Sequence, residues 1–272
     1  MSVVVLNEVT SEEEFGGKAV NLGAALRAGL AVPPGFALSV ALVNRVAAGE
    51  PEAIAQVQGL LANVGPAVAV RSSAIGEDSA TASFAGQHAT VLGVRTPEGL
   101  IDAVRQVWTS GRSESALAYR RKLGREAEPR VGAVVQHLVE ADCAGVLFTC
   151  NPMTGADERV VEASWGLGEA VVGGLVTPDR FRISRDGRIL ERTPGEKDLA
   201  IEPLPEGGTH EVTVSPERVS ALCLDEQQLR ALHVLASRCE THFGAKQELD
   251  LEWAFVGPRL FLLQCRAVTR GG

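Results

Sequence analysis

An arginine stands where an apolar run gives way to a long segment of small residues. The run Ala67–Val70 predicts a short buried strand, and Arg71 follows it directly. The next residues are rich in Gly, Ser, Thr and Ala and extend through Gly86 to a second strand-like run that includes Thr90. Arginine is a permanent planar cation, and small side chains let backbone N–H groups approach anionic oxygens. The pattern indicates a phosphate-binding loop, although composition alone fits an ordinary surface loop equally well.

The segment 247–266 carries a second group of polar side chains. It contains two alternating runs separated by a turn, which predicts a β-hairpin with one polar face. In that hairpin Glu252 should lie opposite Gln264, and Asp250 opposite Arg266. Carboxylate and amide oxygens are ligands that Mg²⁺ prefers, and a guanidinium can stabilise a transferring phosphoryl group. A solvated sheet face with cross-strand ion pairs accounts for the same pattern.

Three further polar residues lie beside the ends of predicted elements. Lys18 begins a predicted helix, where N–H groups and the helix dipole favour anions, although the pattern alone favours a plain surface lysine. Gln136 lies late in an apolar strand and needs a partner, either an adenine edge or an internal hydrogen bond. Glu169 follows a glycine-rich loop and fits either a metal or phosphate site or a structural role.

The elements that must position these residues are both helices and strands. We expect helices over 18–27, 41–64 with an interruption near 49–51, 97–123 and 224–243. We expect strands over 3–6, 67–70, 89–94, 131–136, 144–149, 160–162, 181–184, 189–192, 247–255 and 260–266. Residues 202–215, with their prolines and glycines, are typical of a connector.

Composition narrows the function classes. The 272 residues are 45% hydrophobic and 22% charged, which is an ordinary balance for a globular chain with a real core. A formal net charge of −8 argues against a nonspecific nucleic-acid binder. No run reaches the length of a membrane helix, and the first residues lack the basic start of a signal peptide. The five cysteines form no CxxC pair, so we expect reduced thiols and a cytoplasmic protein.

Five motifs, in order along the chain, give a resemblance to a known family. They are GGKAVNLG at 16–23, VRSSAIGEDSATASFAGQ at 70–87, VVQ at 134–136, ASWGLGE at 163–169, and DLEW at 250–253 with QCR at 264–266. Together they resemble the nucleotide-binding domain of the phosphoenolpyruvate synthase, pyruvate phosphate dikinase and rifampicin phosphotransferase family. Each motif alone is weak, but the ordered set covers nearly the whole chain.

The resemblance implies an α+β fold of the ATP-grasp type, in which two lobes close on a nucleotide. We expect residues 1–190 to form the N-terminal lobe and residues 191–272 the C-terminal lobe. Carried over position by position, the nucleotide-binding residues would be Lys18, Arg71, Gly86, Thr90, Gln136, Glu252, Gln264 and Arg266. Of these, Glu252 and Gln264 would bind Mg²⁺, while Lys18, Arg71 and Arg266 would act in catalysis. ATP and Mg²⁺ are the implied cofactors.

Members of the family work by relay, in which ATP phosphorylates a histidine on a swivelling domain that then passes the phosphoryl group to an acceptor. None of the five histidines here lies in the setting typical of that carrier. The resemblance therefore implies a subunit that phosphorylates a carrier histidine on a separate chain, with a small molecule as final acceptor. A self-sufficient small-molecule kinase or ligase and a nonenzymatic nucleotide-binding module are the alternatives. The relay would yield AMP, whereas a simple kinase would yield ADP.

Overall fold

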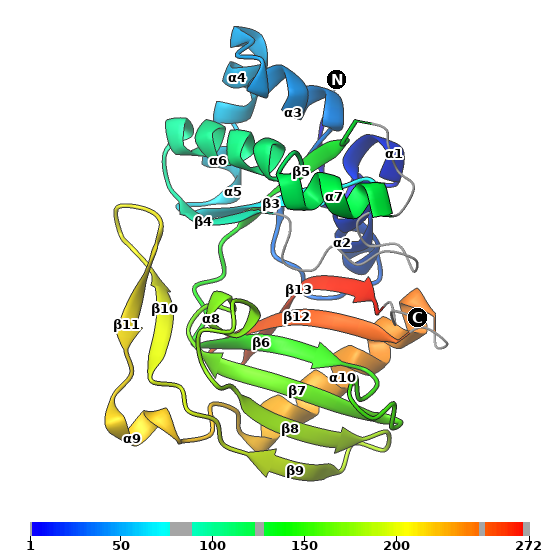
Figure 1. Cartoon of the computed structure of the whole chain (residues 1–272), viewed down its shortest axis with the longest axis vertical. Coiled ribbons are helices and arrows are strands. Elements are labelled where there is room, and N and C mark those ends of the chain that lie inside the picture. The colour runs from blue at the N-terminus through cyan, green and yellow to red at the C-terminus, as the bar shows by residue number, and fades with distance from the viewer. Residues whose placement is uncertain (1, 77–88, 123–127, 245–247, 269–272) are drawn as a thin grey trace.

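Two antiparallel β-sheets with packed helices form the framework of the chain (Figure 1). The computed structural model describes residues 2–76, 89–122, 128–244 and 248–268. Besides a 3₁₀ turn at Leu6–Glu8, the helices are α1 (Glu12–Phe15), α2 (Gly17–Arg27), α3 (Val40–Ala47), α4 (Pro51–Gln58), α5 (Leu61–Val64), α6 (Pro97–Ser110), α7 (Glu114–Lys122), α8 (Glu169–Val172), α9 (Pro216–Val219) and α10 (Glu226–Phe243). The strands are β1 (Val3–Val5), β2 (Gly35–Leu38), β3 (Val68–Ala74), β4 (Thr90–Val94), β5 (Val131–His137), β6 (Cys143–Phe148), β7 (Glu158–Trp165), β8 (Asp179–Ser184), β9 (Ile189–Thr193), β10 (Leu199–Pro203), β11 (Thr209–Thr213), β12 (Leu249–Val256) and β13 (Arg259–Ala267).

The first sheet carries Arg71, the predicted phosphate-binding arginine, on β3, between β5 and the edge strand β4. Its strand order is β1-β2-β5-β3-β4, and every neighbouring pair is antiparallel. Val68 and Val70 of β3 are fully buried in one apolar cluster with Val43 of α3 and Val104 of α6. Because successive side chains of a strand point to opposite faces, Arg71 lies on the face away from these helices.

The second sheet has the order β13-β12-β6-β7-β8-β9 and is also antiparallel throughout. Helix α10 packs on one of its faces, and Figure 1 shows the helix behind the sheet. Leu251 and Trp253 of β12 are fully buried with Leu232 and Cys239 of α10. The alternation of β12 therefore places Glu252 on the opposite face.

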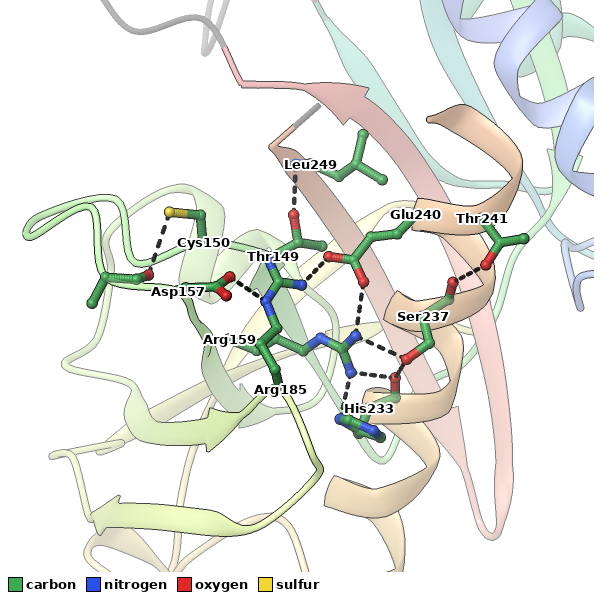
Figure 2. A network of polar contacts seen from close by, with 11 residues as sticks. Thr149, Cys150, Asp157, Arg159, Arg185, His233, Ser237, Glu240, Thr241 and Leu249 are labelled. Atoms are coloured by element: carbon green, nitrogen blue, oxygen red, sulfur yellow. Dashed lines mark hydrogen bonds and ion pairs between the residues drawn. The ribbon is translucent and has the colours of Figure 1, made fainter. Parts of the chain in front are cut away.

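Polar contacts also tie α10 to the second sheet, as Figure 2 shows. Arg159 of β7 is buried and donates hydrogen bonds to Ser237 Oγ and Glu240 Oε2, each at 2.8 Å, and to the carbonyl of His233 at 2.6 Å. Arg185 pairs with the other oxygen of Glu240. This network lies on the α10 side of the sheet, so it is structural rather than part of the face that carries Glu252.

Helix α2 joins the two sheets. The backbone N–H of Ala19 donates to Ser73 Oγ on β3 at 3.0 Å, and Asn21 Nδ2 donates to the carbonyl of Cys265 on β13 at 3.3 Å. The start of α2 approaches β3 so closely that a Cβ on Gly16, which has φ +83°, would lie 1.9 Å from the Ser73 carbonyl oxygen. Glycine at position 16 therefore permits this close approach, and Lys18 follows in the first turn of α2.

Three sequence expectations were wrong in detail. Arg71 lies in the middle of β3 and not at a strand end, because the small, buried Ser72 and Ser73 continue the pairing with β5. The helix expected over 97–123 is interrupted, and α6 ends before Gly111. The connector expected over 202–215 contains most of a two-stranded hairpin, β10–β11.

The chain passes from the first sheet to the second between His137 and Cys143. Strands β6 to β9 belong to the same sheet as β12 and β13, joined to them through the pairing of β6 with β12, so the boundary expected at residue 190 does not coincide with this change of sheet. We propose that the two lobes meet at residues 138–142. The α+β fold with two lobes is confirmed. Among the helices of the described residues, none has the length and apolar character needed to cross a bilayer.

Candidate functional site

A cavity of about 540 Å³ lies between the two sheets. The first sheet contributes Arg71, Thr90 and Gln136 to its wall, and the second contributes Glu252. Glu169, at the start of α8, also lines it. Most of the remaining wall is apolar, with leucines, alanines and glycines from both lobes. A cavity with a largely apolar wall and a few polar groups is typical of a small-molecule site.

Arg71 connects the two sheets at the polar side of this cavity. Its Nη2 donates to Glu252 Oε2 at 2.6 Å, and its Nη1 donates to the carbonyl of Leu263 at 2.6 Å. In the first sheet Arg71 lies opposite Thr90 of β4, so both side chains belong to the same face. A guanidinium and a carboxylate separated by 181 positions in sequence are thus brought into direct contact.

Lys18 makes a second connection beside the first. Its Nζ donates to Gln264 Oε1 at 2.7 Å, and both residues are buried, with exposed fractions of 6% and 5%. The lysine stands in the first turn of α2 and the glutamine on β13. A buried ammonium needs anionic or carbonyl partners, because desolvation of an isolated charge is costly.

The terminal hairpin has the register that the sequence predicts. Glu252 lies opposite Gln264, and Asp250 lies opposite Arg266. Arg266 donates from Nε at 2.8 Å and from Nη2 at 2.6 Å to Asp250 Oδ2. The other oxygen, Asp250 Oδ1, is buried and accepts no hydrogen bond from the described residues. A buried carboxylate oxygen without a partner lowers the stability of the fold unless it binds a cation or accepts a hydrogen bond.

The two carboxylates of the hairpin have opposite pKa shifts. Burial acts to raise the pKa of Glu252, but the nearby charges of Arg71 and Lys18 outweigh it and hold the pKa below its usual value. Burial raises the pKa of Asp250, although the charge of Arg266 acts against this. The surrounding charges therefore favour the ionised form of Glu252, while burial disfavours the ionised form of Asp250.

The oxygen atoms of this group suit Mg²⁺ better than a transition metal. Glu252, Gln264 and Asp250 offer only carboxylate and amide oxygens, which are hard ligands. Among the described residues, no group of three or more His, Cys, Asp or Glu side chains could hold a metal ion. Mg²⁺ fits such a sparse set because it usually keeps several waters and shares its remaining positions with substrate phosphates. The unpartnered Asp250 Oδ1 supports a cation at this place.

Gln136 lies in the cavity wall but already has an internal partner. Its Nε2 donates to the carbonyl of Pro33 at 2.9 Å, so the internal hydrogen bond that the sequence left open is present. Its side-chain oxygen accepts no hydrogen bond from the described residues. Thr90 lines the same cavity, whereas the predicted Gly86 lies outside the described residues.

Sequence reasoning gave no firm role to Glu169, which lines the cavity, or to Asp250, which lies on the hairpin beside Glu252. Asp250 was expected only as the cross-strand neighbour of Arg266, although its position two residues before Glu252 already places it on the same face. Glu169 was left between a functional and a structural role. Burial raises the pKa of Glu169, which accepts a hydrogen bond from Thr209 Oγ1 at 3.2 Å.

Comparison with known proteins extends this picture. The sequence model of the family described as pyruvate phosphate dikinase, AMP/ATP-binding domain, matches residues 51–272. A probable phosphoenolpyruvate synthase of Methanothermobacter thermautotrophicus is 34% identical over 94% of this chain and 44% of its own length. A rifampicin phosphotransferase of Streptomyces sviceus is 34% identical over 93% and 34%, and the prodigiosin synthesizing transferase PigC of Serratia marcescens is 35% identical over 94% and 31%.

The chain spans less than half the length of each of these relatives. Among solved structures, a dinucleotide-forming acetyl-coenzyme A synthetase 1 of Ca. Korarchaeum cryptofilum aligns over 93% of this chain and 92% of its own. The TM-score is 0.47 and the sequence identity is 10%.

Proposed function

Because this chain belongs to the family of pyruvate phosphate dikinase AMP/ATP-binding domains, as its motifs indicated, we propose that it binds MgATP between its lobes and transfers a phosphoryl group from it. The arrangement would be that of an ATP-grasp enzyme, in which two lobes hold the nucleotide between them. The phosphoenolpyruvate synthase and rifampicin phosphotransferase names of its relatives support an ATP-dependent phosphotransferase.

One observation carries the proposal. Two cations of the first lobe, Arg71 and Lys18, contact two oxygen ligands of the second, Glu252 and Gln264, at the edge of a cavity large enough for a nucleotide. Cations and oxygen ligands gathered at one edge of a cavity form the electrostatic environment that phosphoryl transfer requires. The apolar remainder of the cavity suits a purine base and a ribose.

Each residue then has a chemical role. Glu252 and Gln264 would hold Mg²⁺ together with phosphate oxygens, and the bound ion would neutralise charge that develops during transfer. Arg71, Lys18 and Arg266 would bind phosphate oxygens and stabilise the transferring group. In the described structure the three cations contact side chains of the terminal hairpin. When a nucleotide binds, they would give up some of these contacts and bind phosphate oxygens instead.

We further propose that the first acceptor is a histidine on a separate domain or chain, from which the phosphoryl group passes to a small molecule. Two of this chain's histidines are already engaged elsewhere: the Nδ1 of His210 contacts the Glu202 carbonyl at 3.2 Å, and His233 contacts Arg159. We also propose a cytoplasmic location, because the five cysteines are thiols and four of them are buried.

Product analysis tests the function. The purified chain is incubated with Mg²⁺ and ATP, with and without a histidine-bearing domain taken from a full-length relative, and AMP is resolved from ADP. AMP that forms only with the added domain supports the relay. ADP formed with a small acceptor alone would indicate a self-sufficient kinase, and bound ATP without any product would indicate a nucleotide-binding module.

Gln136 offers a test of base recognition. Its unbonded side-chain oxygen could accept a hydrogen bond from the exocyclic amine of adenine, while its Nε2 stays on Pro33. A glutamate at this position would set a buried carboxylate oxygen against the Pro33 carbonyl, so Gln136→Leu is compared with the unmodified chain. Gln136→Leu should weaken binding by roughly fivefold, the value of one hydrogen bond of about 1 kcal/mol. Calorimetric titration with ATP measures both affinities, and equal affinities in the variant and the unmodified chain would contradict the assignment.

Arg71 offers a test of the phosphate contacts. We expect Arg71→Met to lower the rate of phosphoryl transfer by roughly 10²-fold, the effect of losing one electrostatic stabiliser. Arg266→Lys should lower the rate less than Arg71→Met, because it keeps the positive charge although it loses the two-point contact of Nε and Nη2 with Asp250 Oδ2. Single-turnover kinetics measures both rates. Arg230→Ala, an exposed arginine of α10, is the control and should change nothing.

A further inference from the structure

Arg95 joins three separate segments of the molecule. It follows β4 of the first sheet directly. Its Nε donates to the carbonyl of Leu204, at the tip of the β10–β11 hairpin, at 3.0 Å. Its Nη2 pairs at 3.0 Å with Glu140, which lies in the connection between the two lobes. The side chain is only 20% exposed, so the contact with the carbonyl is a shielded, charge-assisted hydrogen bond.

The tip of the hairpin contacts the first sheet at a second point. The N–H of Gly208 donates to the carbonyl of Gly93 on β4 at 2.9 Å. Gly93 has φ +71°, and a Cβ built on it would lie 2.3 Å from the carbonyl oxygen of Gly208. Only glycine permits this approach. Figure 1 shows the hairpin running from the second lobe up to β4.

The same hairpin also forms part of the cavity wall. Ile201 of β10 lines the cavity, and its carbonyl accepts from the N–H of Leu167, another lining residue, at 2.9 Å. Thr209 of β11 donates to Glu169, which also lines the cavity. Leu92 lies one residue before Gly93 and lines the cavity from the first sheet. The hairpin therefore covers a part of the wall that is apolar apart from Glu169, unlike the charged part at Arg71. We call these two parts the apolar side and the charged side.

The two lobes are thus connected on both sides of the cavity by different kinds of contact. On the charged side, Arg71 and Lys18 bind residues of the second lobe that we assign to phosphate and Mg²⁺, so those contacts must exchange when a nucleotide enters. On the apolar side, the contacts of Arg95 involve no ligand-binding group. They can stay in place while the charged contacts change.

We propose that Arg95 is a positioning residue that fixes the β10–β11 hairpin to the first lobe and so keeps the base side of the cavity closed around a bound nucleotide. This inference rests on the proposed nucleotide site. Arg95 contacts neither the cavity nor the phosphate-binding groups; it acts through the hairpin. Loss of Arg95 should therefore speed the escape of the nucleotide without slowing the chemical step.

The experiment follows the dissociation of a fluorescent ATP analogue in the presence of Mg²⁺ by stopped flow. We expect Arg95→Ala to raise the dissociation rate about tenfold, the lower range for a hydrogen bond to a charged group. Gly93→Ala, which pushes the hairpin tip away by a different route, should do the same. The rate of phosphoryl transfer at saturating ATP should stay within twofold of the unmodified chain. Arg105→Ala, which breaks an exposed pair on α6, is the control and should leave dissociation unchanged.

Hydrogen–deuterium exchange without nucleotide gives an independent result. In Arg95→Ala, amides of residues 199–213 should exchange faster, while those of α10 should not change. Unchanged dissociation together with unchanged exchange in this hairpin would overturn the proposal. Failure of the unmodified chain to bind the analogue would refute the nucleotide site instead, and faster exchange of the hairpin in Arg95→Ala would still show that Arg95 anchors it.

Discussion

Glu252→Ala is expected to lower Mg²⁺-dependent phosphoryl transfer by roughly 10³-fold or more, because it removes a carboxylate that lies close to both Arg71 and Lys18. Several kcal/mol of charge stabilisation depend on a bound cation, and Glu252 is the proposed anionic ligand. The variant should fold, since the side chain lies on the sheet face opposite to α10 and is partly exposed. Single-turnover transfer with a range of Mg²⁺ concentrations measures the loss.

Glu162→Ala is a matched control for Glu252→Ala. Glu162 lies on the same face of the same sheet and in the same row, since Glu252 pairs with Val146 and Val146 with Glu162. It does not line the cavity. We expect the rate of phosphoryl transfer in Glu162→Ala to equal that of the unmodified chain. Equal losses in both variants would mean that the effect comes from the general charge of the face, and full activity in Glu252→Ala would refute the metal assignment.

Arg159→Ala is expected to lower the free energy of unfolding by about 3–5 kcal/mol, the usual cost of removing one partner of a buried ion pair. Arg159 is 2% exposed and holds Ser237, Glu240 and the His233 carbonyl of α10 against β7 (Figure 2). Burial lowers its pKa, although Glu240 acts to raise it. The substitution would leave Glu240 shielded, with only Arg185 to compensate.

Urea denaturation followed by far-UV circular dichroism measures this loss. Arg188→Ala provides the control, because that arginine pairs with Asp186 at the surface and should change stability by less than about 1 kcal/mol. Nucleotide affinity of folded Arg159→Ala should be unchanged, since the network lies on the α10 face. A loss below about 1 kcal/mol would show that the network is not needed to hold α10 on the sheet.

Local alternation was sufficient to predict the terminal hairpin. Its strands have a period of two, and a turn centred near Pro258 predicts Glu252 opposite Gln264. The observed turn is Gly257-Pro258, and a β-bulge between Glu252 and Trp253 shifts the register by one residue, so that Glu252 does pair with Gln264. The contact between Lys18 and Gln264 joins residues 246 positions apart and could not follow from any local pattern. It came instead from the resemblance, which placed both residues in one site.

The errors have physical reasons of the same kind. Ser72 and Ser73 look like loop residues by composition, yet their small side chains fit a buried strand, and Arg71 consequently lies inside β3. The lobe boundary stays a prediction, and our proposal for it depends on which strands pair. Strands β6 to β9 share a sheet with β12, which lies about 100 residues after β6 in the sequence. The periodicity of a sequence cannot predict a pairing between strands so far apart. Arg95 carried no motif, and its importance appears only through contacts at residues 140 and 204.

Binding of ATP to the unmodified chain, measured by calorimetry with and without Mg²⁺, tests the central claim most directly. If the cavity between the lobes is a MgATP site, one ATP should bind per chain, and removal of Mg²⁺ with a chelator should weaken binding at least tenfold. Mg²⁺-dependent binding that Glu252→Ala abolishes would establish the site. No binding of ATP, or binding of equal strength without Mg²⁺ and in Glu252→Ala, would contradict it.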